Sequence, residues 1–192
     1  MSVTSNFMGL QMNIFCYFIS TLFVIVELAQ PAHAQSSIND LMNDLNSSGP
    51  VEAKRLSREI ERLWSQSGSV SIDLLLRRGR EATEAGDFDV AIEHLTAVTD
   101  HAPNFAEGWH ARATAFYLKG LYGPALDDLQ KALLLNPNNY NAIFGLGMML
   151  TEFGDLDRAE QAFSQVIDLN PNHENASNAL ERLRMDGIGR EL

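Results

Sequence analysis

A period of 34 residues, present in three copies, constrains the fold of this chain more than any other feature. When the sequence from Ile72 onward is shifted against itself by 34 residues, small, apolar, glycine and proline positions coincide. Such self-similarity indicates a solenoid, because each copy is one supersecondary unit that buries its apolar side against its neighbours. The matched columns are Gly86, Gly120 and Gly154; Pro103, Pro137 and Pro171; Gly79, Ala113 and Gly147; Ala91, Ala125 and Ala159; and Leu95, Leu129 and Phe163.

Each column has a physical reason. A unit of 34 residues has room for two helices of about 14 residues and two turns. The glycine column is expected to end the first helix in a left-handed conformation, and Asp87 and Asp155 are expected to cap the second helix. Small residues let the two helices approach closely. The proline column ends the second helix, and the asparagines beside it, Asn104, Asn138 and Asn172, are expected to cap the next helix.

The segments LLLRRGREATEAGDFDVAIEHLTAVTDHAPN, GWHARATAFYLKGLYGPALDDLQKALLLNPN and AIFGLGMMLTEFGDLDRAEQAFSQVIDLNPN resemble three consecutive tetratricopeptide-repeat (TPR) units. The resemblance covers residues 72–173. It implies an all-α fold, a right-handed TPR superhelix (α-solenoid) whose first helices line a concave groove. It is specific for the fold and says little about the partner.

The flanking segments complete the expected architecture. An apolar stripe of Leu56, Ile60, Leu63 and Trp64 predicts a helix from about residue 50 to 66, which with residues 38–45 makes a helical pair covering the first repeat. Residues 174–185 resemble the helix that closes many TPR arrays. The predicted boundaries are 1–34 for a signal segment, 35–71 for the N-terminal helical extension, 72–105, 106–139 and 140–173 for the three repeats, and 174–192 for the capping helix and tail.

The first 34 residues differ from the rest. Residues 1–26 carry no charge, and residues 14–26 form an apolar run that suits a signal sequence and is short for a membrane span. Ala32-His33-Ala34 matches a signal-peptidase site, which favours export to the periplasm with cleavage after Ala34. No Lys or Arg precedes the run, so an uncleaved inner-membrane anchor is the alternative. The single cysteine, Cys16, lies in this segment.

By resemblance, the groove is the first candidate for a binding site. It would mix aromatic, sulfur and cationic side chains able to hold an extended peptide or a helix. The alternative is that Leu76, Phe144 and Met148 only pack between helices. The predicted partner-binding residues are Leu76, Arg77, Arg80, His110, Thr114, Tyr117, Phe144, Met148 and Arg182, with Asn178 beside them.

Some TPR domains hold a carboxylate at the C-terminus of a peptide with Lys, Asn and Arg. The matching positions here are Leu76, Arg80, Ala111, Asn141 and Gly145, so that residue set is absent. A receptor for chaperone tails of that type is therefore disfavoured.

Arg78 and Arg112 occupy a column where the third copy has Leu146. They could bind a ligand, but an ion pair inside the repeat is favoured, with Arg112 reaching Asp128 on the second helix of its own unit.

Catalytic and metal sites have little support, and no cofactor is predicted. No two histidines of residues 35–192 stand three or four apart, and that stretch has no cysteine. The carboxylate pairs at residues 87/89 and 155/157 lie in helix turns, where capping explains them. No phosphate loop or nucleophile motif is present. An enzyme with a composite site is therefore the least favoured reading.

The charge is uneven along the chain. Its formal net charge is −11, which argues against a nucleic-acid partner. Residues 51–80 hold seven basic and four acidic residues, whereas residues 81–192 hold seven basic and eighteen acidic residues. The basic side chains Lys54, Arg55, Arg58 and Arg62 could meet anionic lipid, but the interleaved glutamates favour a solvated helix face.

These observations predict a non-enzymatic protein-interaction module. We expect a periplasmic adaptor that binds a peptide or helix of an envelope protein in its groove. The alternative is a membrane-anchored scaffold that self-associates, in which case the partners are a membrane and further copies of the chain.

Overall fold

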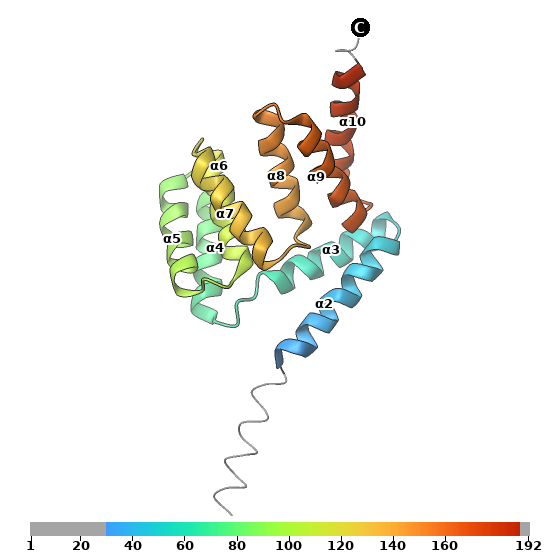
Figure 1. Cartoon of the computed structure of the whole chain (residues 1–192). Helices are drawn as coiled ribbons and strands as arrows, with labels where there is room; N and C mark the ends of the chain where they lie inside the picture. Colours follow the sequence, from blue (N-terminus) through green and yellow to red (C-terminus); the bar gives the residue numbers. More distant parts are fainter. Residues whose placement is uncertain (1–29, 189–192) are drawn as a thin grey trace, which may run out of the picture. The chain divides into compact units, whose positions relative to one another are not determined.

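The computed structural model describes residues 30–188, and within them the chain is entirely helical (Figure 1). The chain divides into two compact units, residues 1–41 and residues 42–192, and helix α2 (Gln30–Ser47) crosses the boundary. The predicted apolar run at residues 14–26 and Cys16 lie outside the described residues, whereas the predicted cleavage position, Ala34, falls within α2. None of the helices between residues 30 and 188 is both long and apolar enough to span a bilayer.

Three helix pairs make up the repeats, as the 34-residue period predicts. Residues 42–192 also contain α3 (Pro50–Trp64) before the pairs and α10 (Glu174–Ile188) after them. Neighbouring helices in each pair run in opposite directions, and the pairs stack one on the next (Figure 1). The pairs are α4 (Val70–Ala85) with α5 (Phe88–His101), α6 (Ala106–Leu118) with α7 (Tyr122–Leu135), and α8 (Tyr140–Glu152) with α9 (Leu156–Leu169).

The glycine column does what its spacing predicts. Gly86, Gly120 and Gly154 have φ values of 81°, 80° and 77°, in the left-handed region that other residues rarely adopt. At each position the first helix of the pair ends and the chain reverses into the second helix.

The small-residue column allows the close approach that was predicted. A Cβ atom added to Gly79 would lie 2.4 Å from Leu95 Cγ, and one added to Gly147 would lie 2.6 Å from Phe163 Cε1. The large residue of the second helix therefore fills the space left by the small residue of the first. Leu95 and Phe163 are completely or almost completely buried, and each belongs to the apolar core of its own repeat.

The predicted caps are partly wrong. The Asp155 side chain accepts a hydrogen bond from the Arg158 amide, as expected, whereas the Asp87 side chain makes no capping hydrogen bond. After the proline column, the capping residue lies one position later than predicted. Asn139 Oδ1 accepts from the Ala142 amide at 3.1 Å, and His173 Nδ1 accepts from the Ala176 amide at 3.1 Å.

The same shift occurs in the first repeat, where the residue at the start of α6 is Phe105 rather than Asn104. The physical reason is visible in the other two turns. The side chains of Asn136 and Asn170 accept hydrogen bonds from the amides of Asn138 and Asn172, at 3.2 Å each. These local turns hold residues 138 and 172 outside the helix, so the next helix starts one residue later.

Helix α3 reaches further than the first repeat, which the sequence had predicted it to cover. At its C-terminal end, Arg80 of α4 donates a hydrogen bond to Ser65 Oγ at 3.0 Å. At its N-terminal end, Asn172 Nδ2, in the turn before α10, donates to the Ser48 carbonyl at 3.0 Å. Figure 1 shows α3 passing along the lower ends of α8 and α9. It therefore spans the array from the first repeat to the end of the third.

Candidate functional site

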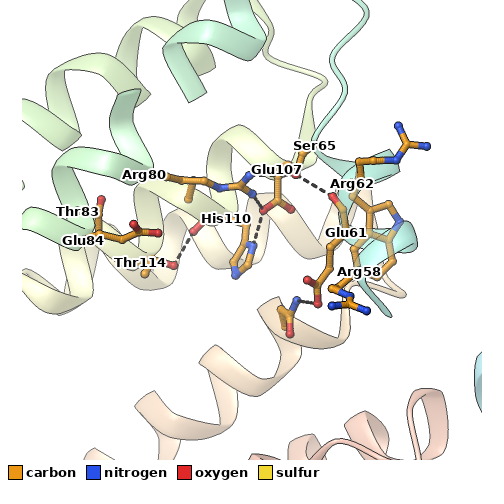
Figure 2. Close-up of a pocket in the computed structure, with 13 residues that line it drawn as sticks. Arg58, Glu61, Arg62, Ser65, Arg80, Thr83, Glu84, Glu107, His110 and Thr114 are labelled. Atoms are coloured by element: carbon orange, nitrogen blue, oxygen red, sulfur yellow. Dashed lines mark hydrogen bonds and ion pairs between the residues drawn. The ribbon is translucent and has the colours of Figure 1, made fainter. Parts of the chain in front are cut away.

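A cavity of about 470 Å³ opens between α3, α4, α6 and α8, and Figure 2 shows the side chains that surround it. We call it the central cavity. Its wall is mostly polar and includes three arginines and three glutamates. The lining residues are Arg58, Glu61, Arg62, Trp64, Ser65, Arg80, Thr83, Glu84, Glu107, His110, Ala111, Thr114 and Asn141.

Glu107, in the first turn of α6, organises one wall of the central cavity. Its side chain is only 8% exposed, and its Oε1 atom accepts a hydrogen bond from Arg80 Nη2 and lies 3.1 Å from His110 Nδ1. Its Oε2 atom accepts from Asn139 Nδ2 at 3.1 Å. Burial alone would raise the pKa of Glu107, but His110 and Arg80 outweigh it and hold the pKa below its ordinary value. The buried carboxylate is therefore charged at neutral pH and fixes the directions of Arg80 and His110.

Glu61 of α3 provides the opposite wall. Its Oε1 atom accepts hydrogen bonds from Asn141 Nδ2 at 2.9 Å and from the Tyr140 hydroxyl at 3.3 Å. Trp64, one turn further along α3, places its ring 5.1 Å from that of Tyr140. Burial and the negative charge of Glu61 raise the pKa of the Tyr140 hydroxyl, so it remains a hydrogen-bond donor throughout the physiological range.

A second hollow of about 460 Å³ lies between α8 and α10, and we call it the C-terminal hollow. It is lined by Phe144, Met148, Asn178 and Arg182, together with Asn175 and Glu181. The central cavity and the C-terminal hollow both lie along the first helices of the repeats, and together we call them the groove. The combination of aromatic, thioether and cationic groups suits a protein segment better than a small polar metabolite.

The structure brings most of the predicted groove residues together, in two groups. Arg80, His110 and Thr114 line the central cavity, and Phe144, Met148 and Arg182 line the C-terminal hollow with Asn178. The remaining three lie elsewhere. Leu76 is buried in the apolar core of the first repeat, Arg77 pairs with Glu81 on the exposed side of α4, and Tyr117 donates a hydrogen bond to Glu152 Oε1 at 2.6 Å.

Tyr117 belongs to a different surface feature, an aromatic cluster near the turns inside the second and third repeats. Its ring lies 5.7 Å from that of Tyr122, which in turn meets Phe153 edge-on at 5.8 Å. The hydrogen bond to Glu152 raises the pKa of the Tyr117 hydroxyl to about 12. Because both of its polar and aromatic contacts are internal, Tyr117 stabilises the pairing of the two repeats.

Sequence reasoning missed the contribution of α3. Glu61, Trp64 and Arg58 come from outside the 34-residue repeat, so the repeat pattern gave no reason to place them at the groove. Glu107 was also missed, because an acidic residue in the first turn of a helix is ordinarily explained by the helix dipole. The available signal was the pairing of a polar face on α3 with the basic residues that follow it in α4.

The prediction for Arg112 is confirmed. Its Nε atom donates to Asp128 Oδ2 at 2.6 Å and its Nη2 atom to Asp128 Oδ1 at 2.9 Å, so the ion pair is bidentate. The guanidinium also lies over the rings of Trp109 and Phe116, at 5.0 and 5.6 Å from their centroids. Arg112 is therefore an internal strut of the second repeat.

Three of the five positions that bind a peptide carboxylate in some TPR domains face the central cavity here. Arg80, Ala111 and Asn141 line it, but Ala111 has no polar group to offer. Asn141 is already engaged by the Glu61 carboxylate of the same chain. In the part of the chain that the structure describes, no group of three or more His, Cys, Asp and Glu side chains is arranged to hold a metal ion.

Comparisons with known proteins agree with this architecture. Two family models described as tetratricopeptide repeat match residues 76–133 and 116–183. The chain therefore belongs to the tetratricopeptide-repeat proteins. Proteins with this fold are typically interaction modules that bind other proteins or peptides.

Among curated proteins, a TPR repeat-containing protein of Rhizobium etli is 27% identical over 134 residues, which are 70% of this chain and 66% of that protein. The DnaJ homolog subfamily C member 3 of Mus musculus is 29% identical over 60% of this chain and 23% of its own length. The chain thus spans just under two thirds of the first relative and less than a quarter of the second.

Solved structures share the fold at lower sequence identity. The first TPR of Spaghetti (RPAP3), bound to the HSP90 peptide SRMEEVD, superposes with a TM-score of 0.58 at 24% identity, covering 62% of this chain and 94% of that one. The type III secretion chaperone SycD of Yersinia enterocolitica, in complex with a peptide of the translocator YopD, gives 0.57 at 15% identity, covering 62% and 96%.

Proposed function

We propose that this protein is an exported, non-enzymatic adaptor that binds a segment of another envelope protein in its groove. The observation that carries the proposal is the central cavity, an open polar space whose side chains are held in fixed directions by Glu107 and Asn141. Preorganised donors reduce the cost of ordering the site when a partner binds. Two TPR structures of the same fold hold a peptide, which supports the same use here.

The chemistry of the cavity favours a partner segment that contains a carboxylate. Arg58 lines the cavity with an exposed side chain and forms no salt bridge within residues 30–188. Arg80 is 39% exposed even though it contacts Glu107. These two guanidinium groups can meet an acidic side chain, and such charge-assisted hydrogen bonds are the stronger kind.

The proposal of an envelope location rests on the N-terminal sequence. An apolar run without charges precedes Ala32-His33-Ala34, and residues 35–192 contain no cysteine. Export with cleavage after Ala34 would leave a chain beginning at Gln35. An uncleaved N-terminus would instead tether the repeats to a membrane.

The test is affinity capture of the tagged full-length protein from its native cells, with Thr114→Trp as the blocking variant. Thr114 is exposed on α6 and lines the central cavity, so a tryptophan there fills the cavity without removing an internal contact between helices. Leu134→Trp is the matched control, because Leu134 is 81% exposed and lines none of the hollows described above.

We expect the wild type and Leu134→Trp to capture the same envelope protein and Thr114→Trp to lose it. Equal capture by all three forms would place the binding site outside the central cavity. Mass spectrometry of the captured protein's N-terminus tests the location: a chain beginning at Gln35 supports cleavage, and a chain that retains residues 1–34 contradicts it.

A further inference from the structure

One face of α3 lies on the repeats through polar and aromatic contacts, in the same region as the proposed binding site. Ser57, Glu61 and Trp64 recur at intervals of four and three residues, which places them on one side of the helix. Each contacts the first turn of α8 or the turn before α10. In this arrangement α3 is bound by the repeats as a separate helix of a partner protein would be.

The contacts follow one another along α3. Asn170 Nδ2 donates to Ser57 Oγ at 3.3 Å, Asn141 Nδ2 donates to Glu61 Oε1 at 2.9 Å, and the Trp64 ring packs on Tyr140. These partners belong to the third repeat, which is roughly 80 to 110 residues away in sequence. A helix that only capped the first repeat would not need them.

Helix α3 does not fill the space that it occupies. The central cavity lies on one side of it, and a further hollow of about 780 Å³, lined by Ser57, Tyr140 and Asn170 among others, lies on the other. Both hollows share Arg58, Glu61 and Asn141. Protein interiors are ordinarily packed at the density of organic crystals, so open space on two sides of a helix indicates a loosely docked element.

The connection to the repeats also permits movement. Residues 65–69, Ser-Gln-Ser-Gly-Ser, join α3 to α4, and Gly68 adopts a left-handed φ of 83°. A short polar segment rich in Ser and Gly is a flexible tether. It keeps α3 close to the groove at a high effective concentration and still lets it leave.

We propose that α3 is a built-in occupant of the groove, displaced by a partner helix that presents a carboxylate and, three residues further on, an aromatic side chain. The pattern is that of Glu61 and Trp64, whose contacts on Asn141 and Tyr140 the partner would take over. The inference rests on the proposed function, because it names the regulation and the partner chemistry of the same site. Binding is then a competition between two helices for one set of donors.

The test uses a labelled synthetic peptide that copies residues 50–66 as the probe, and the full chain carrying Cys16→Ser as the receptor. A released form carries Glu61→Ala and Trp64→Ala, which remove groove contacts and leave the buried Ile60 in place. A control form carries Glu52→Ala and Arg55→Ala, an exposed pair on α3 that lines neither hollow beside it. A locked form carries Glu61→Cys and Asn141→Cys joined by a short bis-maleimide.

We expect the released form to bind the peptide about tenfold more tightly than the unmodified receptor, since its own helix has lost two hydrogen bonds and an aromatic contact. The control form should match the unmodified receptor, and the locked form should bind no peptide. Binding by the released form that is no tighter than by the receptor, or binding by the locked form, would overturn the proposal.

Hydrogen exchange on the same proteins guards against a folding defect. In the released form, protection of the α3 amides should fall while protection of α4 to α9 stays unchanged. A parallel loss in α4 and α6 would show that α3 is an integral part of the fold and would also overturn the proposal. The peptide result does not involve the natural partner, so failure of partner capture would refute the proposed function and leave this result standing.

Discussion

Two glycines of α8, Gly147 and Gly145, offer a sharp test of how the third repeat is packed. They lie on the same helix two residues apart, yet their surroundings differ. A Cβ atom at Gly147 would be 2.6 Å from Phe163 Cε1, nearer than real Cβ atoms come to other heavy atoms. A Cβ atom at Gly145 would meet Leu129 Cδ2 at 3.7 Å, an ordinary van der Waals contact.

The magnitude follows from two opposing effects. Replacing glycine by alanine inside a helix stabilises it by about 0.8–1 kcal/mol, and this gain applies to both positions. Adding a methyl group to a close-packed core costs about 1–3 kcal/mol, and this cost applies only at Gly147, because Phe163 is 1% exposed and cannot move toward solvent. We therefore expect Gly145→Ala to raise the free energy of unfolding by up to about 1 kcal/mol. Gly147→Ala should lower it by up to about 2 kcal/mol.

The assay is urea unfolding of both variants and the wild type, followed by circular dichroism at 222 nm, a helix-sensitive wavelength. The informative quantity is the difference between the two variants, about 1–3 kcal/mol, because the helix-propensity gain cancels in it. Equal stabilisation of the protein by both substitutions would refute the packing of α8 against α9 described above.

Further predictions concern the buried ion pair and a buried histidine. Arg112→Ala should lower the free energy of unfolding by about 3–5 kcal/mol because it leaves Asp128 buried and unpaired. The double variant Arg112→Leu, Asp128→Ala copies Leu146 and Ala162 of the third repeat and should lose less than half as much in the same urea assay. Burial lowers the pKa of His173, whose Nδ1 caps α10, so the folded state resists protonation there. Its contribution to stability is present above the unfolded-state pKa of about 6.5 and falls as the pH drops below it. His173→Asn keeps a capping acceptor without a titrating ring, so its unfolding free energy should decline less than that of the wild type between pH 7.5 and 5.5. An equal decline would mean that His173 does not carry the pH dependence.

The repeat architecture was predictable because each unit is specified locally. Gly86, Gly120 and Gly154 mark the turns by their backbone requirement, and the Gly147–Phe163 contact follows from a small and a large column on facing helices. The exact helix starts were not predictable to one residue. They depend on whether Asn136 or Asn138 supplies its side chain to the turn, a choice that the composition of the turn leaves open.

The groove was predictable in part. Arg80, His110 and Phe144 were identified from their positions on the first helices, and each lines a hollow. The docking of α3 could not be predicted, because its contacts join Glu61 and Trp64 to residues of the third repeat that no local pattern connects to them. Tertiary contacts of this kind depend on how the stacked repeats curve, which a 34-residue period does not specify.

The most direct test of the proposed binding site is site-specific photo-crosslinking in the native cells. A photoreactive phenylalanine derivative at Thr114 lies in the central cavity, and the same residue at Leu134 lies on the exposed outer surface of α7. We predict one discrete protein adduct from position 114 and none of the same mass from position 134. Identical adducts from both positions, or an adduct from position 134 alone, would contradict the assignment of the groove as the binding site.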